Sequence, residues 1–330
     1  MIRALTRGLR AAWRARALVI ALWLVNVATA SLLAIPFGTL LERELHEKES
    51  AATMARGFDY AWWSRWSEAQ QGWTAAFKPD ILGSGFAFRN TELLLKGALP
   101  ANLLAPGAEP SSDAGAPDVD GVVLGLGAFY LLVQVFFAAG IVATLRDPRG
   151  TFTVRAFGHG SSFYFGRMLR IAIVALAADA LLFRLGAPFA GFMAAHARES
   201  VSESAALAWS YARYAGFLAG LLGVHLLAGY ARVFTVLEER KSALLAYVSA
   251  LGFCFRHAAR ALGHYALVAA LAGLSLGLWA VLDSAFAVTG WGTQLLAFVL
   301  MQTFVAARIG LRVALVGGQV ELYRSSDPTR

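Results

Sequence analysis

The chain has 330 residues, of which 58% are hydrophobic and only 15% are charged, and its formal net charge is +8. So apolar a composition exceeds what a soluble domain of this size needs, and it predicts an all-α polytopic membrane protein, a bundle of transmembrane helices. The positive charge does not indicate nucleic-acid binding, because the basic residues alternate with apolar runs, as the positive-inside rule requires of a membrane protein. The single cysteine, Cys254, excludes an intrachain disulfide and a cysteine-built metal site.

Residues 1–16 form a predicted amphipathic arm on the cytoplasmic side. Basic and apolar residues recur there at helical spacing on different faces: Arg3, Arg7, Arg10 and Arg14 on one, Ile2, Leu5, Leu9 and Trp13 on another. Such a helix is expected to lie on an anionic inner leaflet. Span one follows at about 17–38. A cleaved signal peptide is the alternative, since Ala28-Thr29-Ala30 resembles a cleavage site, but the apolar run continues beyond it.

Residues 39–120 form the longest polar segment, which we predict to be an extracytoplasmic loop. Aromatic residues recur within it at spacings of four and seven: Phe58, Trp62, Trp66, Trp73 and Phe77. This pattern predicts a helix lying flat at the membrane surface, because indole prefers the headgroup region. A carbohydrate-binding platform is the alternative. The Pro-, Gly- and Ser-rich stretch 105–121 cannot bury enough apolar area to order itself and predicts a flexible tether.

Five further apolar runs complete a prediction of six spans: about 121–145, 171–193, 209–230, 265–288 and 294–315. Orientation follows from the basic residues of the short connections. The arm, the connection 146–170 and the segment 229–264 hold five Lys or Arg each, whereas the connection around Arg198 holds one. Both termini are therefore expected in the cytoplasm. The weak similarity between the two cytoplasmic connections, Phe163-Tyr164-Phe165-Gly166-Arg167 and Phe253-Cys254-Phe255-Arg256, is too short to establish a duplication.

Charged residues inside the predicted spans suggest two polar layers. A charge at mid-span costs about 2.5–3.5 kcal/mol on insertion scales, so it tends to face the bundle interior with a partner. From the helical rise, we predict an inner layer of Asp179 with Arg308 or His225, and an outer layer of Arg184 with Asp283. These layers either fix the register of the helices or line a proton or solute pathway, and the first interpretation is favoured because the opposite charges balance.

Uncharged polar residues and glycines in the spans predict close helix packing. Asn26, Gln134 and Gln302 are expected to make hydrogen bonds between helices rather than to bind ligands. Three Gly-x3-Gly pairs, at 121 and 125, 216 and 220, and 273 and 277, would let backbones approach, either within the bundle or at a seam between two copies of the chain.

Motifs for catalysis, cofactors and metals are missing from the sequence. There is no GxGxxG, P-loop, HExxH or GxSxG pattern. His257 and His264 lie seven residues apart without a neighbouring acidic ligand, so no metal site is predicted there. We therefore expect neither an enzyme nor a cofactor-binding protein; a membrane-embedded enzyme that uses groups of the outer loop or the membrane interface is the weaker alternative.

The segment 229–264, which we call the elbow, is predicted to connect spans four and five on the cytoplasmic side. Its residues Glu238–Lys241 indicate a solvated turn, and Ser242 is a suitable N-cap for the helix that follows. That helix carries an apolar stripe with basic edges: Val248, Leu251, Phe255 and Leu262, flanked by Arg256 and Arg260. An anionic leaflet attracts such a helix, so the elbow is expected to brace spans four and five on the membrane surface.

The residues of the elbow also carry a resemblance to known families. The order Gly-Tyr-Ala-Arg, Val-x2-Val-Leu-Glu-Glu-Arg-Lys-Ser and Phe-Arg-His between two spans resembles a family of uncharacterised bacterial six-span inner-membrane proteins. It is more distantly similar to the membrane domain of some glycerophosphodiester phosphodiesterases, whose catalytic barrel has no counterpart here. The resemblance covers about a fifth of the chain. It implies a bacterial inner-membrane location and a non-catalytic membrane module.

Together these patterns predict a single membrane domain, most simply a structural or accessory protein that organises lipid or a membrane-protein partner, with a homo-oligomer as a further option. A transporter or channel for a small solute or lipid is the alternative. A polar cavity reaching Asp179 from one face would favour transport, and a fully packed bundle would argue against it.

Overall fold

The computed structural model describes residues 2–45, 53, 59–70, 74, 121–147, 152–285 and 290–326. Within those residues every regular element is a helix: α1 (Ile2–Arg14), α2 (Arg16–Leu45), α4 (Tyr60–Ala69), α7 (Gly121–Arg146), α8 (Val154–Glu199), α9 (Glu203–Leu237), α10 (Ala243–Arg256), α11 (Ala258–Ala285) and α12 (Trp291–Ser326). The predicted all-α fold is confirmed. Trp73 and most of the predicted tether 105–121 lie outside the described residues.

Within the part of the chain that the structure describes, five helices are long and apolar enough to cross a membrane: α2, α7 from Gly125, α9, α11 and α12. They contain five of the six predicted spans, so the protein is a multi-pass membrane protein. The sixth, 171–193, lies inside α8, which is not among the five helices found within the described residues; the side chain of Ala187 in this stretch is not described. The stretch holds two charged residues, Asp179 and Arg184. Its crossing of the membrane stays a prediction.

The chain divides into two compact units, which are described separately. One unit comprises residues 1–84, 119–165 and 257–330, and the other comprises 85–118 and 166–256. The division falls within α8 and at the start of α11. The prediction of a single membrane domain stays a prediction.

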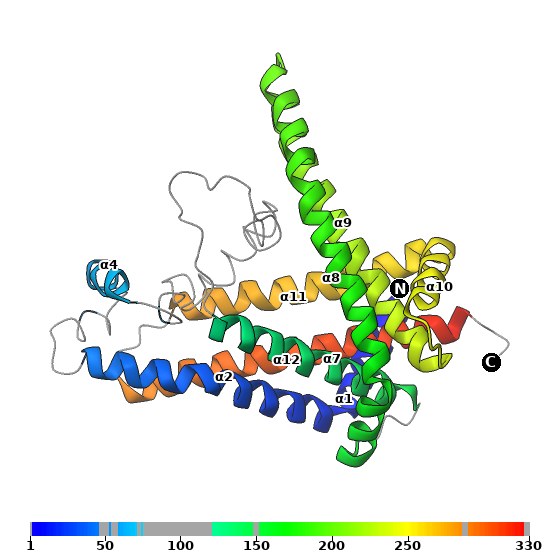
Figure 1. Cartoon of the computed structure of the whole chain (residues 1–330), viewed down its shortest axis with the longest axis horizontal. Coiled ribbons are helices and arrows are strands. Elements are labelled where there is room, and N and C mark those ends of the chain that lie inside the picture. The colour runs from blue at the N-terminus through cyan, green and yellow to red at the C-terminus, as the bar shows by residue number, and fades with distance from the viewer. Residues whose placement is uncertain are drawn as a thin grey trace. The chain divides into compact units, whose positions relative to one another are not determined.

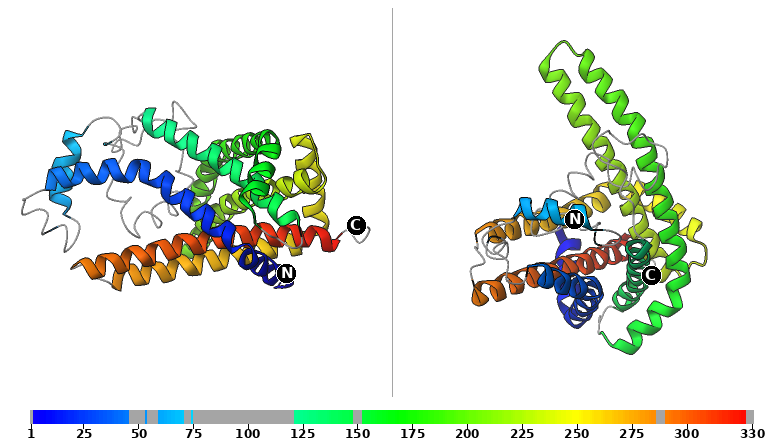
Figure 2. Two further views of the ribbon diagram at one scale, coloured as in Figure 1. Left: turned by 90° about the horizontal axis from the view of Figure 1, so that it is seen from below. Right: turned by 60° about the vertical axis from the view of Figure 1, so that its left-hand side comes forward.

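In the first unit, α12 is the central helix. It contacts α1, α2, α7 and α11, and Figures 1 and 2 show α11 and α12 running side by side along most of their length. The apolar core lies where the first two helices meet: Ala15 and Leu18 are fully buried and pack with Ile141 of α7 and Val313 of α12. The end of the unit that carries the N-terminus is therefore its best-packed part.

Helix α1 docks on α12 through small residues that the sequence analysis did not single out. Ala4, Gly8 and Ala12 recur every four residues and are buried. A Cβ added to Gly8 would lie 2.3 Å from the carbonyl oxygen of Ala314, so only glycine permits this approach. The predicted apolar face of α1 remains exposed, since Ile2 and Trp13 are 67% and 73% accessible. Helix α1 thus packs on protein by one face and offers a second, apolar face to its surroundings.

Helix α4 carries the described part of the aromatic pattern. Asp59 caps its N-terminus by accepting a hydrogen bond from the backbone N–H of Trp62 at 3.0 Å. Trp62 and Trp66 are stacked 5.6 Å apart and are buried with Phe37 of α2. Their indole rings therefore pack on the end of a membrane helix, and the surface position predicted for α4 stays a prediction.

In the second unit, α8 from residue 166 and α9 form a helical hairpin (Figure 2). Two of the predicted small residues make this close packing: a Cβ on Gly216 would lie 2.9 Å from the Phe189 ring, and one on Gly220 would lie 2.7 Å from Leu182. Helix α10 packs on α9, where Tyr230 and Phe253 place their rings 4.9 Å apart. The four other predicted glycines have open space around them, so the Gly-x3-Gly pattern marks a packed face only in α9.

Candidate functional site: an arginine-lined cavity

The predicted inner layer is divided between the two units. In the second unit, Asp179 of α8 and His225 of α9 lie close enough to interact electrostatically, and one carboxylate oxygen of Asp179 is buried without a hydrogen-bond partner. Arg308 lies on α12 in the first unit. Of the two partners predicted for Asp179, the structure brings His225 to it. The outer pair, Arg184 and Asp283, is also divided between the units and stays a prediction.

Arg308 instead lines a cavity of about 460 Å³ within the first unit. Four helices that are predicted to cross the membrane supply its walls: α2, α7, α11 and α12. Six of the lining side chains are polar, namely Asn26, Tyr130, Gln134, Tyr265, Arg308 and Arg312. We call this space the arginine cavity. Its volume falls in the range of small-molecule binding sites, about 300–1,000 Å³.

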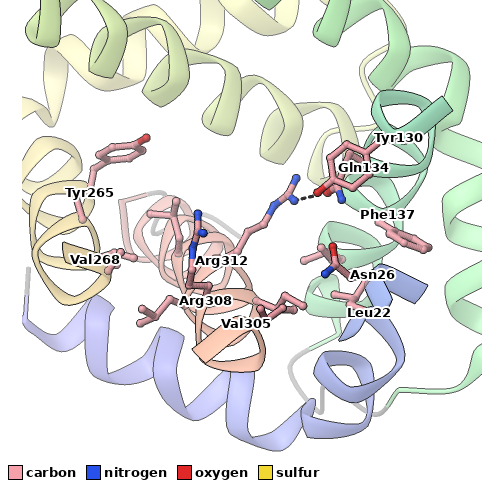
Figure 3. A pocket seen from close by; sticks show the side chains of 16 residues that line it. Leu22, Asn26, Tyr130, Gln134, Phe137, Tyr265, Val268, Val305, Arg308 and Arg312 are labelled. Atoms are coloured by element: carbon pink, nitrogen blue, oxygen red, sulfur yellow. Dashed lines mark hydrogen bonds between the residues drawn. The ribbon is translucent and has the colours of Figure 1, made fainter. Parts of the chain in front are cut away.

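Both arginine side chains are exposed to this space rather than packed in the core. Figure 3 shows their guanidinium groups directed to the same side of α12, between Tyr265 at one edge and Tyr130 with Gln134 at the other. The Arg312 guanidinium donates a hydrogen bond to Oε1 of Gln134. Arg308 lies 5.7 Å from the centre of the Phe304 ring, a cation–π distance. Both positive charges are thus held beside the opening.

The charge of the cavity is not balanced by its own walls. No aspartate or glutamate belongs to the lining that the described residues form. Two guanidinium groups facing a space between apolar helices produce a positive potential there, because the surrounding medium screens charge poorly. The arrangement can therefore attract and hold a negatively charged group.

The cavity lies toward one end of the unit. The lining residues of α2 and α11 lie in the first halves of their predicted spans. Those of α12, and most of those of α7, lie in the second halves of theirs. These are the ends that lie nearest to the N-terminal arm. At about 1.5 Å per residue, Arg312 lies about 5 Å and Arg308 about 10 Å from Leu315, the predicted end of span six. The cavity therefore lies nearer to the arm than to the opposite ends of these helices.

A second hollow of about 310 Å³ lies between α1 and the end of α12. It contains four arginines and two carboxylates: Arg7, Arg10, Arg14, Arg324, Asp147 and Glu321. Arg7 forms an ion pair with Glu321, and Arg324 donates to the backbone carbonyl of Arg146. Because the protein supplies acceptors for these charges, this hollow is a weaker candidate for an anion than the arginine cavity.

The interhelical hydrogen bonds predicted from uncharged polar residues are confirmed at two positions. Gln302 of α12 accepts from the indole N–H of Trp23 in α2 at 2.9 Å. Gln134 of α7 accepts from Arg312, and it also lines the cavity. Asn26 lines the cavity as well. Gln134 and Asn26 are therefore placed to contact a ligand, a role that the sequence analysis did not favour.

The elbow turn is fixed by arginines of α8. Arg167 donates to the backbone carbonyl of Glu239 at 3.2 Å, and Arg170 donates to that of Lys241 at 3.3 Å. Glu239 itself has a φ of 54°, an unfavourable value for a residue with a side chain. Ser242 precedes α10 and accepts from the Leu245 N–H at 3.4 Å, as the N-cap prediction requires. The turn is thus held by the protein rather than only by solvent.

Helix α10 separates small and large apolar residues onto two faces. Ala246, Ala250 and Cys254 are buried, whereas Val248 and Phe255 are 65% and 78% accessible. Burial raises the pKa of the Cys254 thiol to about 11, so the side chain is an uncharged thiol at neutral pH. Burial also raises the pKa of Tyr247 to about 12, although Arg232 opposes the change. The exposed face includes Val248, Leu251 and Phe255 of the predicted apolar stripe, with Arg256 at the end of α10. Leu262 and Arg260 lie on α11, so the single elbow helix predicted to carry the whole stripe is divided at His257.

Comparisons with family models, with curated proteins and with solved structures give no match to this chain. The candidate site therefore rests on its geometry alone. The sequence analysis named Arg308 but missed Arg312, Tyr130 and Tyr265. The spacing of the two arginines, four residues apart near the end of a span, was the available signal, since it places both on one face of a helix.

Proposed function

We propose that the protein is a non-catalytic, multi-pass protein of the bacterial inner membrane that binds an anionic molecule in the arginine cavity. The observation that supports it is the pair of exposed guanidinium groups, Arg308 and Arg312, in a cavity whose described lining holds no carboxylate. An arginine inside a membrane span is costly and tends to mark a functional position. The protein would need no cofactor for this role.

The bacterial location and the orientation rest on the sequence. The elbow resembles that of bacterial inner-membrane proteins, and the excess of Lys and Arg in three short connections favours cytoplasmic termini. With this orientation the arginine cavity lies at the level of the cytoplasmic half of the bilayer. The exposed apolar stripe of α10 and the exposed face of α1 then contact that leaflet, or a membrane-protein partner, on the same side.

A test compares lipids that differ only in the charge of the headgroup. The purified protein in maltoside micelles is mixed with oleate, an oleoyl sulfonate, oleoyl lysophosphatidic acid or neutral monoolein, and the melting temperature is measured. At least one anionic lipid is expected to raise the melting temperature, and monoolein is not. The bound lipid should be recovered chemically unchanged by mass spectrometry, as a non-catalytic role requires.

The matched variants remove two charges inside or outside the cavity. Arg308→Gln with Arg312→Gln should abolish the stabilisation, whereas Arg3→Gln with Arg155→Gln, two exposed arginines outside the cavity lining, should retain it. Equal stabilisation by monoolein and by the anionic lipids, or equal loss in both double variants, would refute an anion site in the cavity.

Transport of the bound anion is the second candidate function. The size of the arginine cavity favours it, because about 460 Å³ can hold a small solute. Asp179, the residue expected on a transport pathway, is not among the lining residues. Uptake of a radiolabelled anion into proteoliposomes, driven by an imposed gradient and lost in the Arg308→Gln, Arg312→Gln variant, would establish transport over simple binding.

A further inference from the structure

We propose that the ligand of the arginine cavity is a phosphate group, either the headgroup phosphate of a phospholipid or a free phosphate ion. This inference rests on the proposed anion site and specifies its chemistry. It follows from the number and the arrangement of hydrogen-bond donors around the cavity, and from the apolar residues that line the rest of it.

The donors come from two adjacent helices and converge on one region. Arg308 and Arg312 are one turn apart on α12, about 6 Å along the helix axis, and both guanidinium groups project into the opening (Figure 3). Arg312 uses one N–H in its bond to Gln134, and its other N–H groups can serve a ligand. Since the Gln134 oxygen is already an acceptor for Arg312, the amide nitrogen of Gln134 is left as a further donor.

Tyr130 and Asn26 extend this set of donors. Tyr130 lies one turn before Gln134 on α7, and Figure 3 shows its side chain overlapping that of Gln134 at the edge of the cavity. Asn26 lies on α2 and contributes a second amide. The described polar lining therefore offers many N–H and O–H groups and no carboxylate that would repel an anion.

This set of donors suits phosphate better than carboxylate. One guanidinium group can bind both oxygens of a carboxylate through two parallel hydrogen bonds, so a second arginine has to share those same two oxygens. A phosphate ion or a phosphate monoester has three or four unesterified oxygens in different directions, so two guanidinium groups and a hydroxyl can each bind a separate oxygen. Arginine is also the residue that most often recognises phosphate through such paired bonds.

Apolar residues line the rest of the cavity: Val268, Ala269 and Ala272 of α11, and Val305 and Ile309 of α12, the helix that carries both arginines. These side chains can contact the glycerol or acyl carbons attached to a lipid phosphate. The arginines lie within about 10 Å of the predicted inner end of span six, a depth that a headgroup or a dissolved ion can reach from the cytoplasmic side. Both sources of phosphate are therefore tested.

The experiment measures binding to the full-length protein in maltoside micelles in two arms. In the first, the melting temperature and native mass spectra are recorded with oleoyl lysophosphatidic acid, and with oleate and oleoyl sulfonate at equal concentrations. In the second, inorganic phosphate is compared with sulfate and chloride at constant ionic strength. The phosphate compound should bind at least 10-fold more tightly than oleate in the first arm or than chloride in the second, and the responding arm identifies the source. The sulfonate and sulfate measure how much of this binding any anion with three or four oxygens obtains.

Conservative variants separate hydrogen bonding from charge and from folding. Arg308→Lys with Arg312→Lys keeps both charges but removes the planar forks, and it should weaken phosphate binding roughly 10-fold to 100-fold. Tyr130→Phe tests the hydroxyl alone, with an expected loss of about 10-fold and an unchanged melting temperature without ligand. This single variant keeps the test valid if a double variant fails to fold.

Three results would overturn the inference. Stronger binding of oleate or the sulfonate than of the phosphate lipid, with no response to inorganic phosphate, would reject phosphate while leaving an anion site intact. Full phosphate binding by the lysine variant together with the Tyr130→Phe variant would show that charge alone is recognised. The absence of binding by every anion would reject both the phosphate inference and the proposed function.

Discussion

At the residue scale, the glycines of α12 show how closely the first unit is packed. A Cβ on Gly318 would lie 2.2 Å from Cε1 of His264, a fully buried side chain whose Nε2 lies 3.2 Å from the Leu315 carbonyl. Gly310, two turns earlier on the same helix, has no atom within 4 Å of the equivalent position. Gly318 therefore lies in a tight contact between α12, α11 and α1, whereas Gly310 on the same helix faces open space.

This contrast gives a prediction with an internal control. Gly318→Ala should lower the free energy of unfolding by about 1–3 kcal/mol, because His264 must move out of a packed site. Gly310→Ala should be neutral or stabilise the protein by up to about 1 kcal/mol, since alanine has the higher helix propensity. Thermal unfolding in detergent, followed by tryptophan fluorescence, measures both. A similar melting temperature for the two variants would contradict the packing around His264.

Single residues also show what the sequence could and could not predict. The interhelical bond of Gln302 follows from one rule, that an amide in a span seeks a partner. The cavity does not follow from any one residue, because it depends on how far α7 and α11 stand from α12. Gly216 and Gly220 pack against α8 as glycine spacing suggests, whereas Gly273 and Gly277 face open space. Spacing identifies a face, and only the fold shows what covers it.

At the element scale, α1 and α10 share one design. Each buries its small residues and contacts a longer helix. In α1, Gly8 packs against α12. In α10, which contacts α9, Ala250 is fully buried. Each also exposes large apolar side chains, such as Trp13 and Phe255. Amphipathic analysis of the sequence found the large apolar faces but missed the small-residue faces, because alanine and glycine contribute little hydrophobicity. The buried face of a surface helix was therefore the harder one to predict.

The basic edge of the elbow leads to a prediction about membrane attachment. Reversing the charge in Arg256→Glu with Arg260→Glu should weaken contact of the elbow with an anionic leaflet, by about 1 kcal/mol for each basic residue removed. The expected result is a lower yield of membrane-inserted protein and a lower melting temperature in vesicles that contain phosphatidylglycerol, with a smaller effect in neutral vesicles. Arg198→Glu, in the connection predicted on the other side of the membrane, is the control. Unchanged insertion and stability of the double variant would argue against the brace.

At the scale of the whole molecule, the number of spans depends on α8. Among the described residues, five helices qualify as spans by length and composition, and five spans would place the two termini on opposite sides. The predicted stretch 171–193 has 23 residues, which extend about 34 Å as a helix and suffice for a bilayer core of about 30 Å. Its charges make the crossing costly. The proximity of Asp179 to His225 offsets part of this cost. Pairing within the α8–α9 hairpin thus makes a sixth span physically reasonable.

Cysteine labelling on the two ends of α8 decides between five and six spans. In a Cys254→Ala background, single cysteines replace Ser162 and Val201, two exposed residues on either side of the stretch 171–193. If α8 crosses the membrane with cytoplasmic termini, a membrane-impermeant maleimide added to intact spheroplasts should label Val201→Cys and spare Ser162→Cys, and lysis should make both reactive. Equal labelling of the two before lysis would place both ends of α8 on one side. That outcome would reject the sixth span, and at least one terminus would then not be cytoplasmic as predicted. The cytoplasmic access proposed for the arginine cavity, which depends on this orientation, would be rejected as well.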